Sequence, residues 1–249
     1  MPATPAWPPK SAPRLFVTAP LQAGEPITLG GPQAHYLLKV MRAAIGDDVI
    51  LCDNITGEWA ARVSHSGKRD IALIPETLLR PRGEVPDFTL CAALLKKAHF
   101  DLVLEKATEL GVRCIQPVLT RRCVADKINL ERAAAIITEA AEQCARTALP
   151  QLAAPVKLEA LLREWPDGMK LYFADENGGE PAASAFAAHS GPAALLIGPE
   201  GGFDGDERAA IRAHKDTIAI SLGPRILRGE TAAIAGTALW MATSGDWGK

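Results

Sequence analysis

The chain has 249 residues, of which 48% are hydrophobic and 22% charged, and its formal net charge is -2 at pH 7. This composition can bury a full hydrophobic core and argues against a membrane protein, because no apolar run approaches the roughly 20 residues of a spanning helix. The near-neutral charge gives no overall attraction to nucleic acid, so any RNA contact must come from a local basic patch. Five cysteines without a CxxC pair disfavour a disulfide framework and a zinc site, and we expect no metal.

The first part of the chain predicts a leader and a small β-rich domain. Residues 1–13 are rich in proline and alanine but lack the apolar core of a signal peptide, so we expect a disordered leader on a cytoplasmic protein. From 14 to 82, short alternating apolar runs separated by turn residues predict strands. One helix, from about residue 33 to 44, interrupts them, and its spacing predicts these inward-facing side chains: Leu37, Leu38, Val40 and Met41.

The rest of the chain, after about residue 82, has a different pattern of apolar residues. Residues 81–86 contain two prolines and a glycine and indicate a linker. From 87 to 249, strand-like runs alternate with helical ones, which predicts an α/β domain with a largely parallel sheet. Helices are predicted over 99–110, ending at Gly111, and over about 129–148. The predicted strands are 88–95, 113–119, 170–174, 193–198 and 217–222.

Two glycine-bearing loops follow the last two of these strands, and each opens onto a predicted helix. The first is 197–203, with Asp204 and Glu207 forming a capping-box signal, and the second is 222–231. A strand, a glycine turn and a helix start leave backbone N–H and C=O groups bare at the carboxyl edge of a sheet. We therefore expect the loops to share one pocket. Neither carries the lysine of a P-loop or a Gly-x-Gly-x-x-Gly dinucleotide fingerprint.

The second loop carries two arginines and leads into an apolar run. Arg225 and Arg228 place two positive charges beside one glycine turn, which is more than a connecting loop requires and indicates a functional role. The alternative is that both arginines pair with acids at the surface, as arginines often do. Residues 232–242 are apolar almost all round, which indicates burial against the core or a second subunit. A homodimer is therefore plausible.

Taken together, the motifs resemble those of the RsmE family, the 16S ribosomal RNA uridine-N3 methyltransferases of the SPOUT class. The resemblance lies in 197–202 and 222–232 and extends to 106–112, 139–146 and 35–42. It implies an α/β SPOUT methyltransferase domain at 87–249 with a deep C-terminal trefoil knot, and a PUA-like RNA-binding β-barrel at 14–82. It also implies a homodimer that uses S-adenosylmethionine to form 3-methyluridine in 16S rRNA, within the small ribosomal subunit and near the decoding region.

The resemblance, with the chemistry, gives candidate site residues. Uridine N3 is a weakly acidic imide, and a cation beside O2 or O4 would favour its anion, so Arg228 and then Arg225 are the expected catalytic residues. Glu230 would position an arginine, accept a proton or simply match the helix dipole. The predicted cofactor-binding residues are Ala174, Glu176, Asn177, Gly198, Pro199, Glu200, Gly202, Leu222, Gly223, Ile226 and Leu227.

Contacts with RNA are expected to be local. Aromatic residues make up only 5% of the chain, which favours phosphate contacts and RNA shape over base stacking. Two other functions stay open: a SPOUT methyltransferase for another rRNA or tRNA nucleotide, and a non-catalytic RNA-binding protein of ribosome assembly. The predicted RNA-binding residues are Arg14, His35, Lys39, Arg42, Arg62, Lys97, Arg121 and Arg122.

Overall fold

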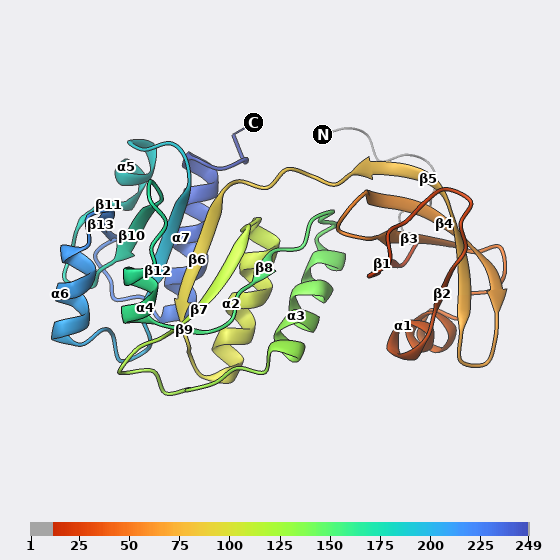
Figure 1. Ribbon diagram of the computed structural model, residues 1–249, viewed down its shortest axis with the longest axis horizontal. Helices are drawn as coiled ribbons and strands as arrows, with labels where there is room; N and C mark the ends of the chain where they lie inside the picture. The colour runs from red at the N-terminus through yellow and green to blue at the C-terminus, as the bar shows by residue number, and fades with distance from the viewer. Residues whose placement is uncertain (1–11, 249) are drawn as a thin grey trace. The chain divides into compact units, whose positions relative to one another are not determined.

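The computed structural model describes residues 12–248, which divide into two compact units (Figure 1). Unit 1 comprises the described residues up to 84 together with 141–149, and unit 2 comprises 85–140 and 150–248. The leader predicted at 1–13 lies outside the described residues except for positions 12 and 13. Segment 141–149, which the sequence places within the 87–249 domain, belongs to unit 1, where the Leu149 N–H donates to Asn54 Oδ1 at 2.7 Å.

A five-stranded sheet organises unit 1, in the order β1-β3-β4-β5-β2. β1 runs parallel to β3, and the other pairings are antiparallel. Alternate residues of each strand turn to one side, so Val49, Leu51 and Val63 meet in a single buried cluster. The strands are β1 (Arg14–Phe16), β2 (Ile27–Leu29), β3 (Asp48–Cys52), β4 (Gly57–Ser66) and β5 (Ile71–Pro81).

The helix of unit 1 differs from its prediction. It consists of α1 (Gly31–His35) and a π-helical turn, η1 (Tyr36–Val40), in which the Met41 N–H donates to the Tyr36 carbonyl at 3.0 Å. Leu37 is fully buried as expected, but the prediction for Val40 and Met41 is wrong, since they are 62% and 40% exposed. The i→i+5 bonding of a π turn holds more residues per turn than an α-helix, so these side chains rotate away from the core.

Unit 2 is built on a parallel sheet in the order β11-β13-β10-β12-β6-β7-β8, with β9 also pairing with β7. Every recorded pairing in this sheet is parallel. The five predicted strands and the parallel sheet are therefore confirmed. The strands are β6 (Phe88–Ala93), β7 (Cys114–Leu119), β8 (Gln151–Leu152), β9 (Val156–Lys157), β10 (Lys170–Ala174), β11 (Glu180–Pro181), β12 (Ala193–Ile197) and β13 (Thr217–Ser221).

Helices cover both faces of this sheet (Figure 1). Successive residues of β10 point to opposite faces, so Tyr172 packs edge-on against Phe186 while Phe173 packs edge-on against Phe203. Among the described residues, no helix is long and apolar enough to cross a membrane. The helices are α2 (Lys97–Leu110), α3 (Leu130–Gln143), α4 (Leu158–Arg163), α5 (Ala182–Ala187), α6 (Gly205–Ala213) and α7 (Gly229–Thr243).

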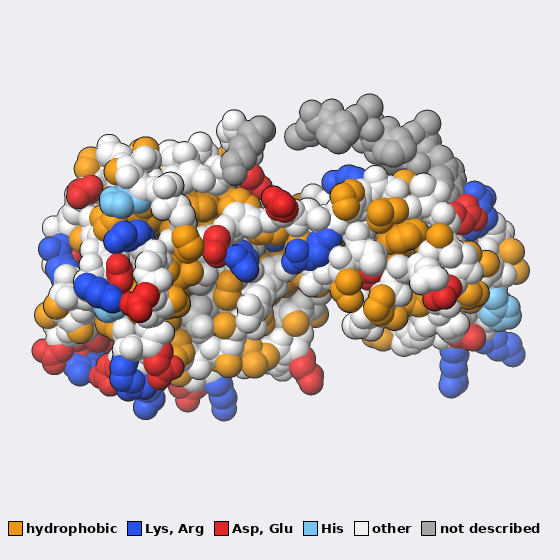
Figure 2. Space-filling model, turned by 45° about the horizontal axis from the view of Figure 1, so that its top comes forward, with side chains coloured by type: hydrophobic (Ala, Val, Ile, Leu, Met, Phe, Trp, Pro, Cys, Tyr) orange, Lys and Arg blue, Asp and Glu red, His pale blue; other side chains and the backbone are white. Residues whose placement is uncertain are grey.

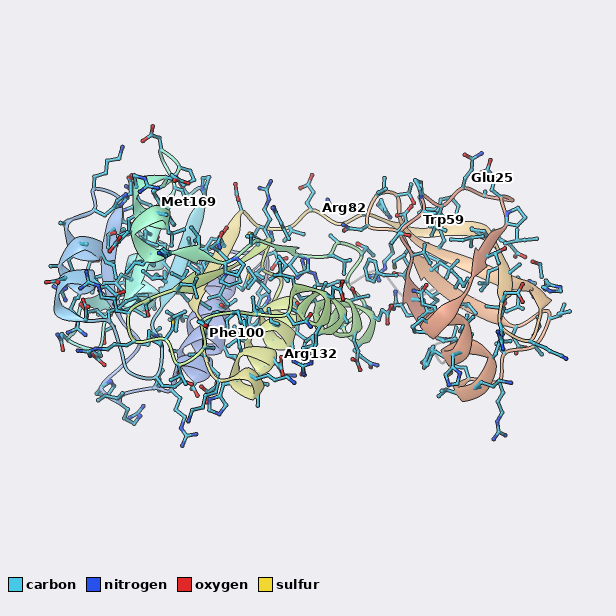
Figure 3. All side chains as sticks on the ribbon, turned by 60° about the horizontal axis from the view of Figure 1, so that its bottom comes forward. Glu25, Trp59, Arg82, Phe100, Arg132 and Met169 are labelled. Atoms are coloured by element: carbon cyan, nitrogen blue, oxygen red, sulfur yellow. The ribbon has the colours of Figure 1, made fainter. Side chains whose placement is uncertain are left out.

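Helices α2 and α7 pack against each other, and α7 also contacts β6 and β12. Trp240 of α7 stacks on Phe88 with ring centroids 4.2 Å apart, and Gly236 leaves room for Leu195. On α2, Phe100 is almost fully buried, whereas Arg132 of α3 reaches Asp101 through two hydrogen bonds (Figure 3). Burial on several sides explains why α7 is apolar almost all round.

Candidate active site

A cavity of about 540 Å³ lies where β10, β12 and β13 end. These strands are parallel neighbours, so the loops that follow them meet at one edge of the sheet. The cavity is lined by residues 197–200, 202 and 203 at the first glycine loop, by 221–230 at the second, and by 173–176 at the end of β10 and just after it. The two loops thus share one pocket, as predicted from the sequence.

Glycines let the two loops approach each other. A Cβ on Gly229 would lie 2.9 Å from Leu95 Cδ2 and 3.2 Å from the Gly198 carbonyl oxygen, so the second loop touches the first at this point. Gly202 and Gly223 have φ angles of 65° and 108°, which favour glycine. The close approach of the two loops and their backbone conformation therefore both require glycine at these positions.

Most of the predicted cofactor-binding residues line this cavity. The exception is Asn177, which is not among the lining residues and whose N–H donates to Asp175 Oδ1 at 2.9 Å. Ile226 lines the cavity but is 86% exposed. The predicted residues at the cavity are Ala174, Glu176, Gly198, Pro199, Glu200, Gly202, Leu222, Gly223, Ile226 and Leu227.

The first glycine loop is fixed by the helix that follows it and by Arg121 and Arg122. Asp204 caps α6 by accepting the Glu207 N–H at 2.7 Å, and Glu207 returns the contact, which confirms the capping box. The N–H of Glu207 and the guanidinium of Arg121 hold the pKa of Asp204 below its ordinary value. Arg122 donates to the Gly201 carbonyl at 3.0 Å. The segment carrying both arginines therefore braces the first loop.

Arg225 and Arg228 line the cavity with exposed side chains. Neither forms a hydrogen bond or ion pair with another side chain in the described part of the chain. Arg208 and Arg212 differ, because both contact the carboxylate of Asp175, whose side chain is fully buried. The two loop arginines thus keep their charge available to a ligand.

Two cavity residues, Lys96 and His99, are missed by the sequence analysis as parts of this pocket. His99 Nδ1 lies 3.7 Å from both Glu200 Oε1 and Glu230 Oε2. Burial opposes the ionisation of Glu200, yet the Lys96 N–H, 3.1 Å away, and nearby His99 hold the pKa of Glu200 below its ordinary value. The sequence signal that could have identified them is their position just after the predicted strand 88–95. This strand becomes β6, which lies beside β12, so the residues that follow it reach the same edge of the sheet.

Two models of known protein families match this chain. A model of the RNA methyltransferase domain matches residues 83–241, more than half of the chain, and a model of the RNA methyltransferase PUA domain matches 29–76. The chain is 30% identical to ribosomal RNA small subunit methyltransferase E (RsmE) of Rickettsia conorii, over 90% of this chain and 93% of the relative. The chain belongs to the RsmE family of RNA methyltransferases.

Further relatives agree with this assignment. The RsmE of a Synechocystis species is 34% identical, over 87% of this chain and 73% of the relative. A Legionella pneumophila methyltransferase solved with bound S-adenosylmethionine is 30% identical with a TM-score of 0.84, covering 94% of this chain and 99% of that one. The structure of RsmE from Neisseria gonorrhoeae, also bound to S-adenosylmethionine, is 26% identical with the same TM-score. The match covers 95% of this chain and 99% of that one.

The residues predicted to bind RNA fall into two groups in this RsmE-family chain. Four have partners within their own unit: Arg14 pairs with Glu58 at 2.8 Å, Arg62 contacts Asp48 and Glu76, and Arg121 and Arg122 brace the glycine loop. The other four are exposed: His35, Lys39, Arg42 and Lys97. Basic and acidic side chains are intermingled over the face seen in Figure 2, so no broad basic surface is visible there.

Proposed function

We propose that this chain is an enzyme that transfers a methyl group from S-adenosylmethionine to N3 of one uridine in the 16S rRNA of the small ribosomal subunit. The observation that carries the proposal is the cavity itself, in which two glycine loops meet beside two arginines without an acidic partner among the described residues. Two relatives named as small-subunit rRNA methyltransferases, and two similar structures solved with S-adenosylmethionine, support it.

The lining residues fit S-adenosylmethionine. The cavity exposes glycine backbone for hydrogen bonds to an adenine and ribose, and added Cβ atoms at Gly198 or Gly202 would come within 3.0 Å of neighbouring side chains. When bound, S-adenosylmethionine supplies a methyl group on a positively charged sulfur. The ten predicted residues at the cavity would hold it, and Asn177 would act only indirectly, through the hydrogen bond that its N–H donates to Asp175.

The arginines would act on the uridine. Methyl transfer requires N3 to carry an electron pair, and a guanidinium near O2 or O4 stabilises the negative charge that deprotonation leaves on the base. Arg228, directly before α7, is the first candidate for this role and Arg225 the second. Glu230 follows within the same helical turn, where its buried carboxylate can position other cavity groups.

Unit 1 would hold the ribosomal RNA. The PUA-domain match lies in this unit, and His35, Lys39 and Arg42 are exposed together on and after α1 and η1. Cations clustered on one short segment can contact successive phosphates without a large net charge on the protein. Lys97 and the partnered basic residues Arg14, Arg62, Arg121 and Arg122 would contribute less directly.

The finer features of the resemblance are part of this proposal. We place the RNA-binding domain at 14–82, closed as a β-barrel, and the methyltransferase domain at 87–249, knotted at its C-terminal end by the segment that carries the second glycine loop. We also propose a cytoplasmic homodimer. Partly buried apolar residues on α7, Ile234 and Leu239, are compatible with a second subunit.

A genetic experiment tests the proposed reaction. Small-subunit rRNA from a strain lacking this protein should lose one 3-methyluridine, and the wild-type gene should restore it. Arg228→Ala should fail to restore it while the protein stays folded, because the anionic base loses its stabilising charge. We expect the rate of methylation to fall by about 100-fold or more. Arg163→Ala is the matched control, since Arg163 is an exposed α4 residue paired with Glu164. An unchanged set of modified bases in the deletion strain would contradict the proposal, and modification by Arg228→Ala would remove Arg228 from the mechanism.

A further inference from the structure

We propose that His99 is the catalytic residue that accepts the N3 proton of the uridine, and that Glu230 and Glu200 fix the tautomer in which it can do so. The inference rests on the proposed function and assigns its missing proton acceptor.

The position of His99 in the cavity supports this role. His99 is the third residue of α2, lines the same cavity as Arg228, and keeps about a third of its side chain exposed (34%). Its Nδ1 atom is shielded from solvent and forms no hydrogen bond with the described residues, and the same holds for Glu230 Oε2, 3.7 Å away. Two unsatisfied polar atoms facing each other in a cavity are costly unless they serve a function.

The carboxylates determine which ring nitrogen is basic. Glu200 and Glu230 both approach Nδ1, so the ring proton is most stable on that nitrogen, and Nε2 then keeps its electron pair. At 3.7 Å neither contact is yet a hydrogen bond. Catalytic hydrogen bonds are often long before substrate binds and shorten in the complex. A histidine backed by a carboxylate is the usual arrangement of a general base.

Other groups in the cavity are less suited to accept the proton. Asp175 and Glu176 are neutralised by Arg208, and Asp175 by Arg212 as well. The carboxylate of Glu200 already accepts a hydrogen bond from the Lys96 N–H, which makes it less ready to take up a proton. The charged groups that line the pocket with this imidazole come from several segments: Glu200 after β12, Glu230 on α7, Lys96 before α2, and Arg225 and Arg228 in the second glycine loop.

The proton and electron pairs balance in this scheme. The N3–H proton moves to Nε2 of His99 as Arg228 stabilises the charge on the base. The N3 electron pair then forms the bond to the methyl carbon while the sulfur–methyl bond breaks, and its electron pair returns to sulfur. The products are 3-methyluridine, S-adenosylhomocysteine and an imidazolium, which Glu230 stabilises until the proton passes to water.

Single-turnover methylation tests the assignment. Small subunits from a strain lacking this protein would be mixed with excess enzyme and labelled S-adenosylmethionine between about pH 5.5 and about pH 9. His99→Gln should lower the rate near neutral pH by about 100-fold or more, as loss of a general base does, with donor affinity measured by calorimetry within about 2-fold. The wild-type rate should rise with pH and level off, whereas the His99→Gln rate should keep rising because hydroxide replaces the base. His189→Gln, at an exposed position outside the cavity lining, should behave as wild type.

Two further variants keep the test decisive. Imidazole added to His99→Ala should recover part of the rate, and Glu230→Gln should slow the reaction by about 10-fold or more, since it loses the carboxylate that orients the ring. A wild-type rate and pH profile in either His99→Gln or Glu230→Gln would overturn the assignment, as would a slowed His99→Gln that still levels off like the wild type. In all three cases 3-methyluridine formed by the wild type would leave the proposed function intact. A wild-type enzyme that forms none would overturn both.

Discussion

At the scale of residues, the site is defined by which charged side chains already have partners. Asp175 is fully buried and holds Arg208 and Arg212, so these arginines contribute to structure around the cavity. Arg225 and Arg228 lack such an acid among the described residues and stay exposed at the same cavity. The neighbours of these arginines therefore distinguish two that are held by a buried acid from two whose charge is available at the cavity.

A buried carboxylate in unit 1 makes stability depend on pH. Asp53 is 3% exposed and accepts hydrogen bonds from the Leu21 N–H, the Thr56 hydroxyl and the Ile55 N–H, at 2.7 to 2.9 Å. Burial opposes its ionisation, but these donors prevail and hold the pKa of Asp53 below its ordinary value. Its folded-state pKa is depressed, so its contribution is complete above the unfolded-state value and is lost as pH falls through the folded-state value.

We expect Asp53→Asn to lower the free energy of unfolding by about 2 kcal/mol at pH 7, because hydrogen bonds to a charged acceptor are replaced by weaker or mismatched ones. Urea unfolding of the full chain at pH 7 and at about pH 3 measures the difference. The deficit should shrink at the lower pH, because Asp53 of the unfolded chain is then largely protonated and the stability that its charge contributes to the fold is partly lost. Asp126→Asn, at an exposed position, should leave the unfolding midpoint unchanged. An equal deficit at both pH values would contradict the argument.

At the scale of elements, the parallel strands and their loops could be predicted because their signals are local. Buried parallel strands give continuous apolar runs, the Asp204 to Glu207 spacing marks the start of α6, and Gly111 ends α2 with a φ of 97°. The features that were not predicted depend on tertiary contacts. They are the π turn that exposes Val40 and Met41, the return of 141–149 to unit 1, and His99, which becomes part of the cavity only when β6 pairs with β12.

The contact between the two glycine loops gives an element-scale prediction. Gly229→Ala places a Cβ against Leu95 and the Gly198 carbonyl, so the loops must move apart by a few tenths of an ångström. Overpacking of this kind costs about 1 to 3 kcal/mol, and we expect affinity for S-adenosylmethionine to fall by about 10-fold. Calorimetric titration measures it. Gly205→Ala is the matched control, since Gly205 also begins a helix but has open space at its Cβ. Equal affinities for the two variants would show that the loop contact does not shape the pocket.

At the scale of the whole molecule, the two units have separate tasks in this account. Unit 2 contains the donor cavity with its arginines and His99. Unit 1 presents His35, Lys39 and Arg42 beside the exposed apolar side chains of Val40 and Ile45. The net charge of -2 gives no general affinity for RNA, so selection of the substrate falls to such local surfaces. A family resemblance could indicate this division from the sequence, whereas the cavity contacts required the fold.

The most direct measurement is the identity of the methylated base formed by the purified protein. Small subunits from a strain lacking this protein would be incubated with the full chain and S-adenosylmethionine carrying a deuterated methyl group, and the rRNA nucleosides analysed by mass spectrometry. The account predicts one labelled 3-methyluridine per 16S rRNA and none when the donor is omitted. No labelled nucleoside, or a label on a different base, would contradict it.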